Sequence, residues 1–133
     1  MTLAEHLRTG ASEPFVWGVA DCCLFPSDWI LTQTGIDAAA PLRGRYRTPV
    51  GAARHIKRRG GFVRMVSDLM AAAGFLETDD PQPGDVGVIH LGDGFAFAIR
   101  TRVGWASKSL SGLGCGPFRH VVAWTIPSKA QPQ

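Results

Sequence analysis

The decisive stretch of this sequence reads Pro14-Phe15-Val16-Trp17-Gly18-Val19-Ala20-Asp21-Cys22-Cys23-Leu24-Phe25 and continues to Leu31. Pro14 and Gly18 are typical of turns, whereas Asp21 has the side chain of a helix N-cap. After Asp21, apolar residues recur at three- and four-residue spacings as far as Ile30. The stretch therefore predicts a helix that starts just after Asp21, with the two cysteines in its first turn.

The adjacent cysteines of this helix start admit two interpretations. Free backbone amides and the positive end of the helix macrodipole favour a thiolate over a thiol, which suits a reactive cysteine. Alternatively, small apolar cysteines simply fill a tight first turn, because free cysteine is among the most buried residue types. The stretch by itself leaves both interpretations open.

Composition indicates one compact domain with an uneven charge distribution. The 133 residues are 45% hydrophobic and 19% charged, and the net charge is +3. Eight of the 14 Lys and Arg residues lie between positions 43 and 64. Such a basic segment suits nucleic acid, an anionic cell-wall polymer or an acidic partner protein. No aromatic ladder or nucleic-acid motif accompanies it, so we do not expect a nucleic-acid partner.

Cysteine usage and hydropathy exclude several classes of protein. Two of the three cysteines are sequence neighbours, which predicts no disulfide framework. The first residues lack the charged and apolar regions of a signal peptide. No stretch reaches the length of a membrane span. We therefore expect the chain to fold in a reducing cytoplasm.

The pattern of the whole chain predicts helices first and strands afterwards. We expect helices over 2–9, from Asp21 to near Gly35, over 49–59 and over 62–73. We expect strands over 86–90, 95–100, 104–107 and 120–126, with a Gly-rich loop over 111–117. This order predicts a single α+β domain over 1–133, its core about 14–126, with an antiparallel meander and a disordered tail over 127–133.

Two short blocks of the sequence resemble NlpC-type cell-wall peptidases, which are small papain-like cysteine hydrolases. The first block is Trp17-Gly18 with Asp21-Cys22 at a helix start, and the second is Pro81-x-x-Gly84-Asp85-Val86 before a strand. Three further features resemble a short branch of that family encoded in phage and prophage tail gene clusters: Arg43-Gly44-Arg45-Tyr46, Gly60-Gly61 and Trp124. The resemblance covers roughly residues 14–126 and implies a papain-like α+β fold.

The resemblance also implies roles for individual residues. The family's nucleophile directly follows the aspartate, which selects Cys22, with Asp21 and Trp17 supporting the site. The family's thiolate attacks a carbonyl of a peptidoglycan stem peptide, and a histidine on the adjacent hairpin acts as base and then as acid. That histidine opens a strand that corresponds here to 95–100, which contains none. Because a cysteine without this partner cannot protonate the leaving amine, we expect impaired or lost catalysis.

Three histidines elsewhere are candidates for the missing base. His120 heads a strand that imitates the family's histidine strand, and it is the best available base. His90 ends the first strand, and His55 lies in the basic helix, where we expect it to be solvated. Each also has the ordinary interpretation of a surface or strand-end histidine.

A metal site is the other chemistry that the sequence offers. Cys22, Cys23, Cys115 and His120 supply four ligands, which is the number that zinc requires. However, neighbouring side chains on a helix diverge by about 100°, and the usual spacing between ligands is absent. We therefore expect no metal and no cofactor, and we interpret Cys115 as a loop thiol.

The four tryptophans divide by their surroundings. We expect Trp29 and Trp124 to anchor the core, and Trp17 to pack under a loop or to line a groove. Trp105 lies between glycines and charges, where an exposed ring would contact a partner.

Together these features predict a phage tail-tip or tail-assembly protein with an NlpC-like fold and degenerate catalysis. We expect assembly in the host cytoplasm and a final location in the virion tail. The expected partners are other tail proteins, contacted through the basic helix and loops, and peptidoglycan. The alternative is an active cysteine peptidase or amidase with Cys22 as nucleophile and His120 as base. A third interpretation is a cytoplasmic binding module without a viral connection.

Overall fold

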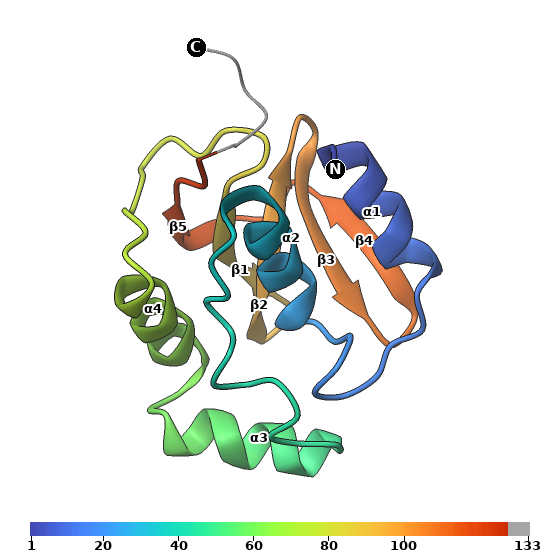
Figure 1. The fold of residues 1–133 in the computed structure, drawn as a ribbon, viewed down its shortest axis with the longest axis vertical. Coiled ribbons are helices and arrows are strands. Elements are labelled where there is room, and N and C mark those ends of the chain that lie inside the picture. Colours follow the sequence, from blue (N-terminus) through green and yellow to red (C-terminus); the bar gives the residue numbers. More distant parts are fainter. Residues whose placement is uncertain (128–133) are drawn as a thin grey trace.

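Four helices precede five strands in the computed structural model, which describes residues 1–127 (Figure 1). The helices are α1 (Leu3–Ser12), α2 (Leu24–Thr34), α3 (Pro49–Arg58) and α4 (Phe62–Ala72). The strands are β1 (Val86–Leu91), β2 (Gly94–Thr101), β3 (Gly104–Ser109), β4 (Gly112–Gly116) and β5 (His120–Trp124). This order confirms the predicted α+β class.

Local sequence signals set most of the helix ends. The hydroxyl of Thr2 accepts a hydrogen bond from the Glu5 amide at the start of α1, and Thr48 does the same for Gly51 at the start of α3. Helix α2 ends at Gly35, which has a φ of 77°, as the sequence predicts. These caps explain why the predicted and observed helices coincide within a few residues.

All five strands form one antiparallel sheet in the order β4-β3-β2-β1-β5. Strands β1 to β3 form a meander as predicted, and β4 extends it. Strand β5, which we expected to be the last strand of the meander, pairs instead with β1 on the opposite edge. The predicted Gly-rich loop over 111–117 is also wrong, because most of it is strand β4, paired with β3 from Trp105 to Ser109. The backbone groups of this segment that face β3 form hydrogen bonds with it, and these bonds define the strand. The side chains of the segment show no alternating pattern that would predict it.

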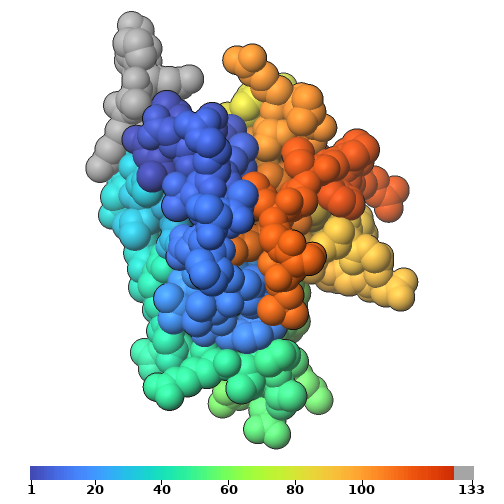
Figure 2. All heavy atoms as spheres, turned by 90° about the vertical axis from the view of Figure 1, so that its right-hand side faces the viewer, coloured from blue at the N-terminus to red at the C-terminus, as the bar shows by residue number. Residues whose placement is uncertain are grey.

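The main core lies between one face of the sheet, here called the inner face, and the helices. It contains Val86, Val88, Phe97 and Ile99 from the strands, together with Leu24, Trp29 and Ile30 from α2, residues of α4 and Trp124. Trp29 and Trp124 are buried there, as predicted. Helix α1 lies beside β4, and the Nζ atom of Lys108 donates a hydrogen bond to the carbonyl of Glu13, just after α1 (Figure 2).

A smaller cluster covers the opposite, outer face of the sheet. It comprises Ile89, Ala96, Ala98, Trp105 and Ala123. Trp105 is only 1% exposed, so the prediction of an exposed aromatic contact is wrong. The ring fits because Gly87 lacks a side chain, and a Cβ there would lie 2.8 Å from it.

Two further expectations concern the C-terminal tail and membrane-spanning helices. The predicted disordered tail over 127–133 lies outside the described residues, except for Pro127. Among residues 1–127, no helix has both the length and the apolar character needed to cross a membrane.

Candidate active site

The candidate site begins with a tight turn from Val16 to Ala20. The Ala20 amide donates to the Val16 carbonyl over 2.8 Å, and the Val16 amide donates to the Ala20 carbonyl over 3.0 Å. Gly18 has a φ of 78°, and a Cβ there would collide with the carbonyl oxygen of Tyr46. The Gly44 amide donates to the Gly18 carbonyl over 2.9 Å. The glycine therefore lets the segment around Tyr46 close against the turn.

The carboxylate of Asp21 is the centre of this arrangement. It is fully buried and accepts four hydrogen bonds. Its Oδ2 atom accepts from the Gly18 amide and the Tyr46 hydroxyl, both over 2.8 Å. Its Oδ1 atom accepts from the Cys23 and Leu24 amides, both over 3.0 Å. Asp21 therefore accepts from amides at the start of α2 as an N-cap side chain would, although the N-cap position itself is Cys23 and not Asp21 as predicted. It also fixes the turn before the helix.

Helix α2 begins slightly later than predicted, so the two cysteines lie before it. Helix α2 begins at Leu24, so Cys22 and Cys23 form a turn before the helix instead of its first turn. The reason is that the Asp21 carboxylate occupies the amides of Cys23 and Leu24, while the Phe25 amide donates to the Asp21 carbonyl over 3.0 Å. No amide at the start of α2 is therefore left free: those of Cys23, Leu24 and Phe25 donate to Asp21, and Pro26 has none.

Cys22 and Cys23 differ in burial and in acidity. Cys22 is half-buried, whereas Cys23 is buried. A hydrogen bond from the Cys23 thiol lowers the pKa of Cys22, although burial and the charge of Asp21 oppose this effect. The same hydrogen bond, together with complete burial, raises the pKa of Cys23 well above its usual range. Cys22 is therefore the thiol of the pair with nucleophilic character.

Metal binding does not suit this group of residues. One oxygen of Asp21 and the two sulfurs lie within 4.8 Å of one another. The carboxylate, however, already accepts four hydrogen bonds, which leaves at most two sulfur ligands where zinc takes four. The other two residues considered as ligands lie elsewhere: Cys115 is exposed on β4, and His120 begins β5.

Trp17 supports the turn from the side. Its half-buried ring packs against the main core and meets the ring of Phe15 edge-on, with the centroids 4.8 Å apart. This matches the packing role that the sequence allowed for Trp17, directly before Gly18 and the Asp21 cap.

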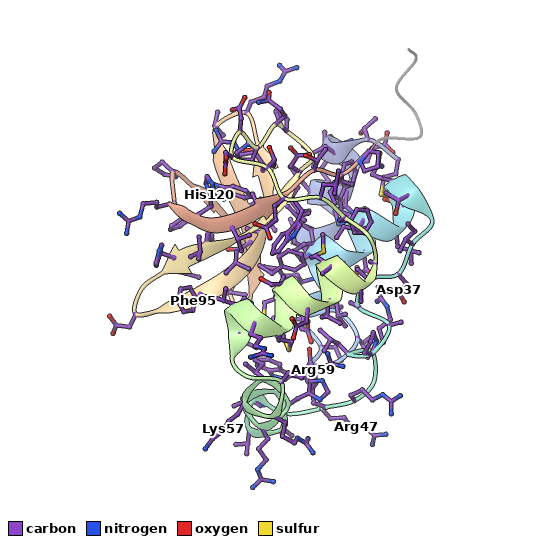
Figure 3. All side chains as sticks on the ribbon, turned by 90° about the vertical axis from the view of Figure 1, so that its left-hand side faces the viewer. Asp37, Arg47, Lys57, Arg59, Phe95 and His120 are labelled. Atoms are coloured by element: carbon purple, nitrogen blue, oxygen red, sulfur yellow. The ribbon has the colours of Figure 1, made fainter. Side chains whose placement is uncertain are left out.

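His120 lies on the wrong face of the sheet to serve Cys22. It pairs with Ile89, whose side chain belongs to the outer cluster, and its ring lies 5.7 Å from that of Trp105. Cys22 packs instead against the main core on the inner face. Figure 3 shows His120 on the side of the sheet away from α2. The expected pairing of Cys22 with His120 is therefore not formed, because a bulge in β5 beside Ile89 sets the face of His120.

The remaining histidines do not replace it. His90 is exposed at the end of β1, beside the ring of Phe95. His55 is half-buried and its Nε2 atom is shielded from solvent, so the prediction of a solvated imidazole is wrong. Its ring lies 5.8 Å from that of Tyr46. Among residues 1–127, no histidine forms a hydrogen bond with Cys22.

Sequence reasoning missed two side chains that shape this region. The first is Tyr46, which belongs to the Arg43-Gly44-Arg45-Tyr46 motif, although no pattern indicates that its hydroxyl reaches Asp21. The second is His6. It is buried, stacks on Phe25 and donates from Nε2 to the Phe25 carbonyl over 2.9 Å. Its position between Leu3 and Leu7 in α1 was the available signal.

The second sequence block joins α2 to the sheet. The indole of Trp29 donates to the Gly84 carbonyl over 2.7 Å. The carboxylate of Asp85 accepts from the Gln82 amide over 2.8 Å and from the Ile126 amide over 3.0 Å. Both blocks therefore fix backbone segments around the start of α2 and the start of β1.

Asp21 should be indispensable for stability. In Asp21→Asn, an NH₂ group replaces one carboxylate oxygen. This group is itself a donor, so it cannot accept the hydrogen bonds that the oxygen accepted. We expect a loss of about 2–4 kcal/mol in the free energy of unfolding, measured by urea denaturation. Asp93→Asn, at an exposed hairpin position, is the matched control and should be neutral. Equal stability of the two variants would contradict the role given to Asp21.

The acidity of Cys22 should depend on its neighbour. In a Cys115→Ser background, Cys23→Ala removes the hydrogen bond that lowers the pKa of Cys22. The midpoint of the alkylation rate against pH should therefore move upward. Cys23→Ser retains a donor and should keep the midpoint close to that of the background protein. An unchanged midpoint in Cys23→Ala would show that the neighbouring thiol does not act on Cys22.

Comparison with known proteins gives one match. The family described as "Domain of unknown function (DUF6950)" matches residues 1–126. No curated protein and no solved structure matches the chain. Because the match spans nearly the whole sequence, the chain belongs to the DUF6950 family.

Proposed function

We propose that this protein is a tail-tip or tail-assembly protein of a phage or prophage, built on an NlpC-like peptidase fold that has lost its catalysis. The proposal joins the family resemblance of the two sequence blocks to the geometry of the candidate site. The tail location, and partners among other tail proteins, follow from the resemblance alone.

The arrangement around Cys22 supports the peptidase-like part of the proposal. A thiol of lowered pKa lies directly after a capping aspartate at the start of α2, and that helix packs against an antiparallel sheet. A thiol of lowered pKa beside the start of a helix is one of the settings in which nucleophilic cysteines occur. The block with Gly84 and Asp85 also lies directly before β1, as it does before a strand in the resembled family.

The position of His120 is the observation that carries the loss of catalysis. Amide hydrolysis requires a group that accepts the thiol proton and then protonates the leaving amine. The best candidate projects from the outer face, whereas Cys22 lies on the inner side. Strand β2 offers only apolar side chains at its start, where the resembled family carries its histidine. Cys22 is then a remnant that fills a tight, capped turn.

An active cysteine peptidase or amidase on peptidoglycan is the second candidate. The lowered pKa of Cys22 and its partial exposure favour it. In that case, Cys22 attacks the stem-peptide carbonyl and a proton carrier other than His120 must approach the sulfur. No metal or cofactor is required for this chemistry.

The two candidates make opposite predictions for Cys22→Ser. If the protein is structural, phage carrying Cys22→Ser should form tails and infect at the level of the parent, while deletion of the gene should abolish tails. Purified protein should release no peptide fragments from cell wall. Loss of infectivity in Cys22→Ser, with wall cleavage by the parent protein alone, would favour the peptidase. Normal tails after deletion of the gene would contradict the structural role.

A further inference from the structure

The basic segment around α3 carries more than half of the Lys and Arg residues of the chain. Between Asp37 and Asp68 the sequence contains eight Arg and Lys residues and no Asp or Glu. The rest of the chain holds the other six basic residues and all eleven acidic ones. The protein is therefore electrically polar, with its positive charge concentrated in one segment.

Most of this positive charge is unpaired. Arg43 bridges Asp28 and Asp37, and Arg64 lies 3.6 Å from Asp68. The other six basic side chains of the segment form no ion pair with any described residue. We call them the α3 cations: Arg45, Arg47, Arg54, Lys57, Arg58 and Arg59.

Five of the six α3 cations group on or beside α3 although they come from different parts of the segment. Arg54, Lys57 and Arg58 line one open hollow on α3. Burial, followed by the nearby guanidinium groups of Arg59, Arg58 and Arg45, lowers the pKa of His55. The loop before α3 and the C-terminal end of the helix therefore place their charges around the same imidazole.

Helix α3 also projects from the body of the protein. It forms one end of the molecule, opposite the top of the sheet (Figures 1 and 2), and of its residues only Ala52 is buried. Figure 3 shows Arg47 and Lys57 pointing away on different sides of α3. At the start of the helix, Val50 is 61% exposed, one turn before Arg54 on the same helix.

We propose that α3 and the loop before it dock an acidic segment of a partner protein. Arginine forks match carboxylates in pairs. A flexible acidic segment can contact cations on several sides of a helix, whereas a stiff nucleic-acid duplex meets one face. Val50 suits an apolar side chain of such a segment, and a phosphate backbone offers none. The negative remainder of the chain also repels a long polyanion.

This inference deepens the proposed function, because it rests on the premise that a tail protein docks on a larger partner. The test needs only purified protein, so its result does not depend on tails or cell wall. If the acidic peptide does not bind, the protein can still be a tail protein that contacts its partner through another surface. If the tail experiments fail, a measured binding of the acidic peptide to α3 still holds.

The test compares ligands and matched variants by titration calorimetry at physiological ionic strength. The probes are a synthetic peptide rich in Glu and Asp with interspersed Leu, its Gln and Asn counterpart, and a DNA duplex of equal charge. The test variant is Arg54→Gln, Lys57→Gln and Arg58→Gln combined, which keeps good helix formers on α3. The control combines Arg8→Gln, Arg102→Gln and Arg119→Gln, three exposed cations of the same total charge outside the segment.

We expect the acidic peptide to bind more tightly than the neutral peptide or the duplex. The test variant should weaken this binding about tenfold, and the control by no more than about twofold. Bound carboxylates should also raise the pKa of His55, followed by NMR, because they offset the three guanidinium groups. Tighter binding of the duplex, equal losses in both variants, an unchanged His55 titration, or salt-sensitive self-association through α3 would each overturn the proposal.

Discussion

The buried carboxylate of Asp21 is the interaction on which the structure around Cys22 depends. A buried charge is costly unless its hydrogen-bonding capacity is filled, and here four donors fill it. Two donors come from the start of α2, one from Gly18 and one from Tyr46. One side chain therefore ties the turn, the helix and the loop before α3 into a single unit.

This unit connects the turn that holds Cys22 with the basic surface. Tyr46, which donates to Asp21, lies beside His55 of α3, and Arg43 reaches Asp28 on α2. The Arg43-Gly44-Arg45-Tyr46 motif therefore anchors the basic segment to the helix that follows Cys22. In a structural tail protein, such an anchor holds the docking surface while the thiol itself does no chemistry. On the proposed function, Cys22 is kept for its fit in the turn.

The sequence predicted elements whose signals are local. The Asp21 cap, the Gly35 end of α2 and the hairpin between β1 and β2 depend on residues within a few positions of each other. Strand β4 escaped prediction because its glycine-rich sequence has no alternating pattern, and only pairing with β3 defines it. The face of His120 depends on a bulge between distant strands, and the Tyr46 contact spans 25 positions. Neither has a local signature.

The central claim is that Cys22, whose pKa is lowered by its neighbour Cys23, has no imidazole partner. The most direct measurement follows the titration of all four histidines by NMR before and after carboxamidomethylation of Cys22, with Cys115→Ser as background. A thiolate and an imidazolium that interact have coupled pKa values. Our account predicts that alkylation leaves every histidine titration unchanged. A shift of about one pKa unit or more in any histidine would contradict it and would identify the missing base.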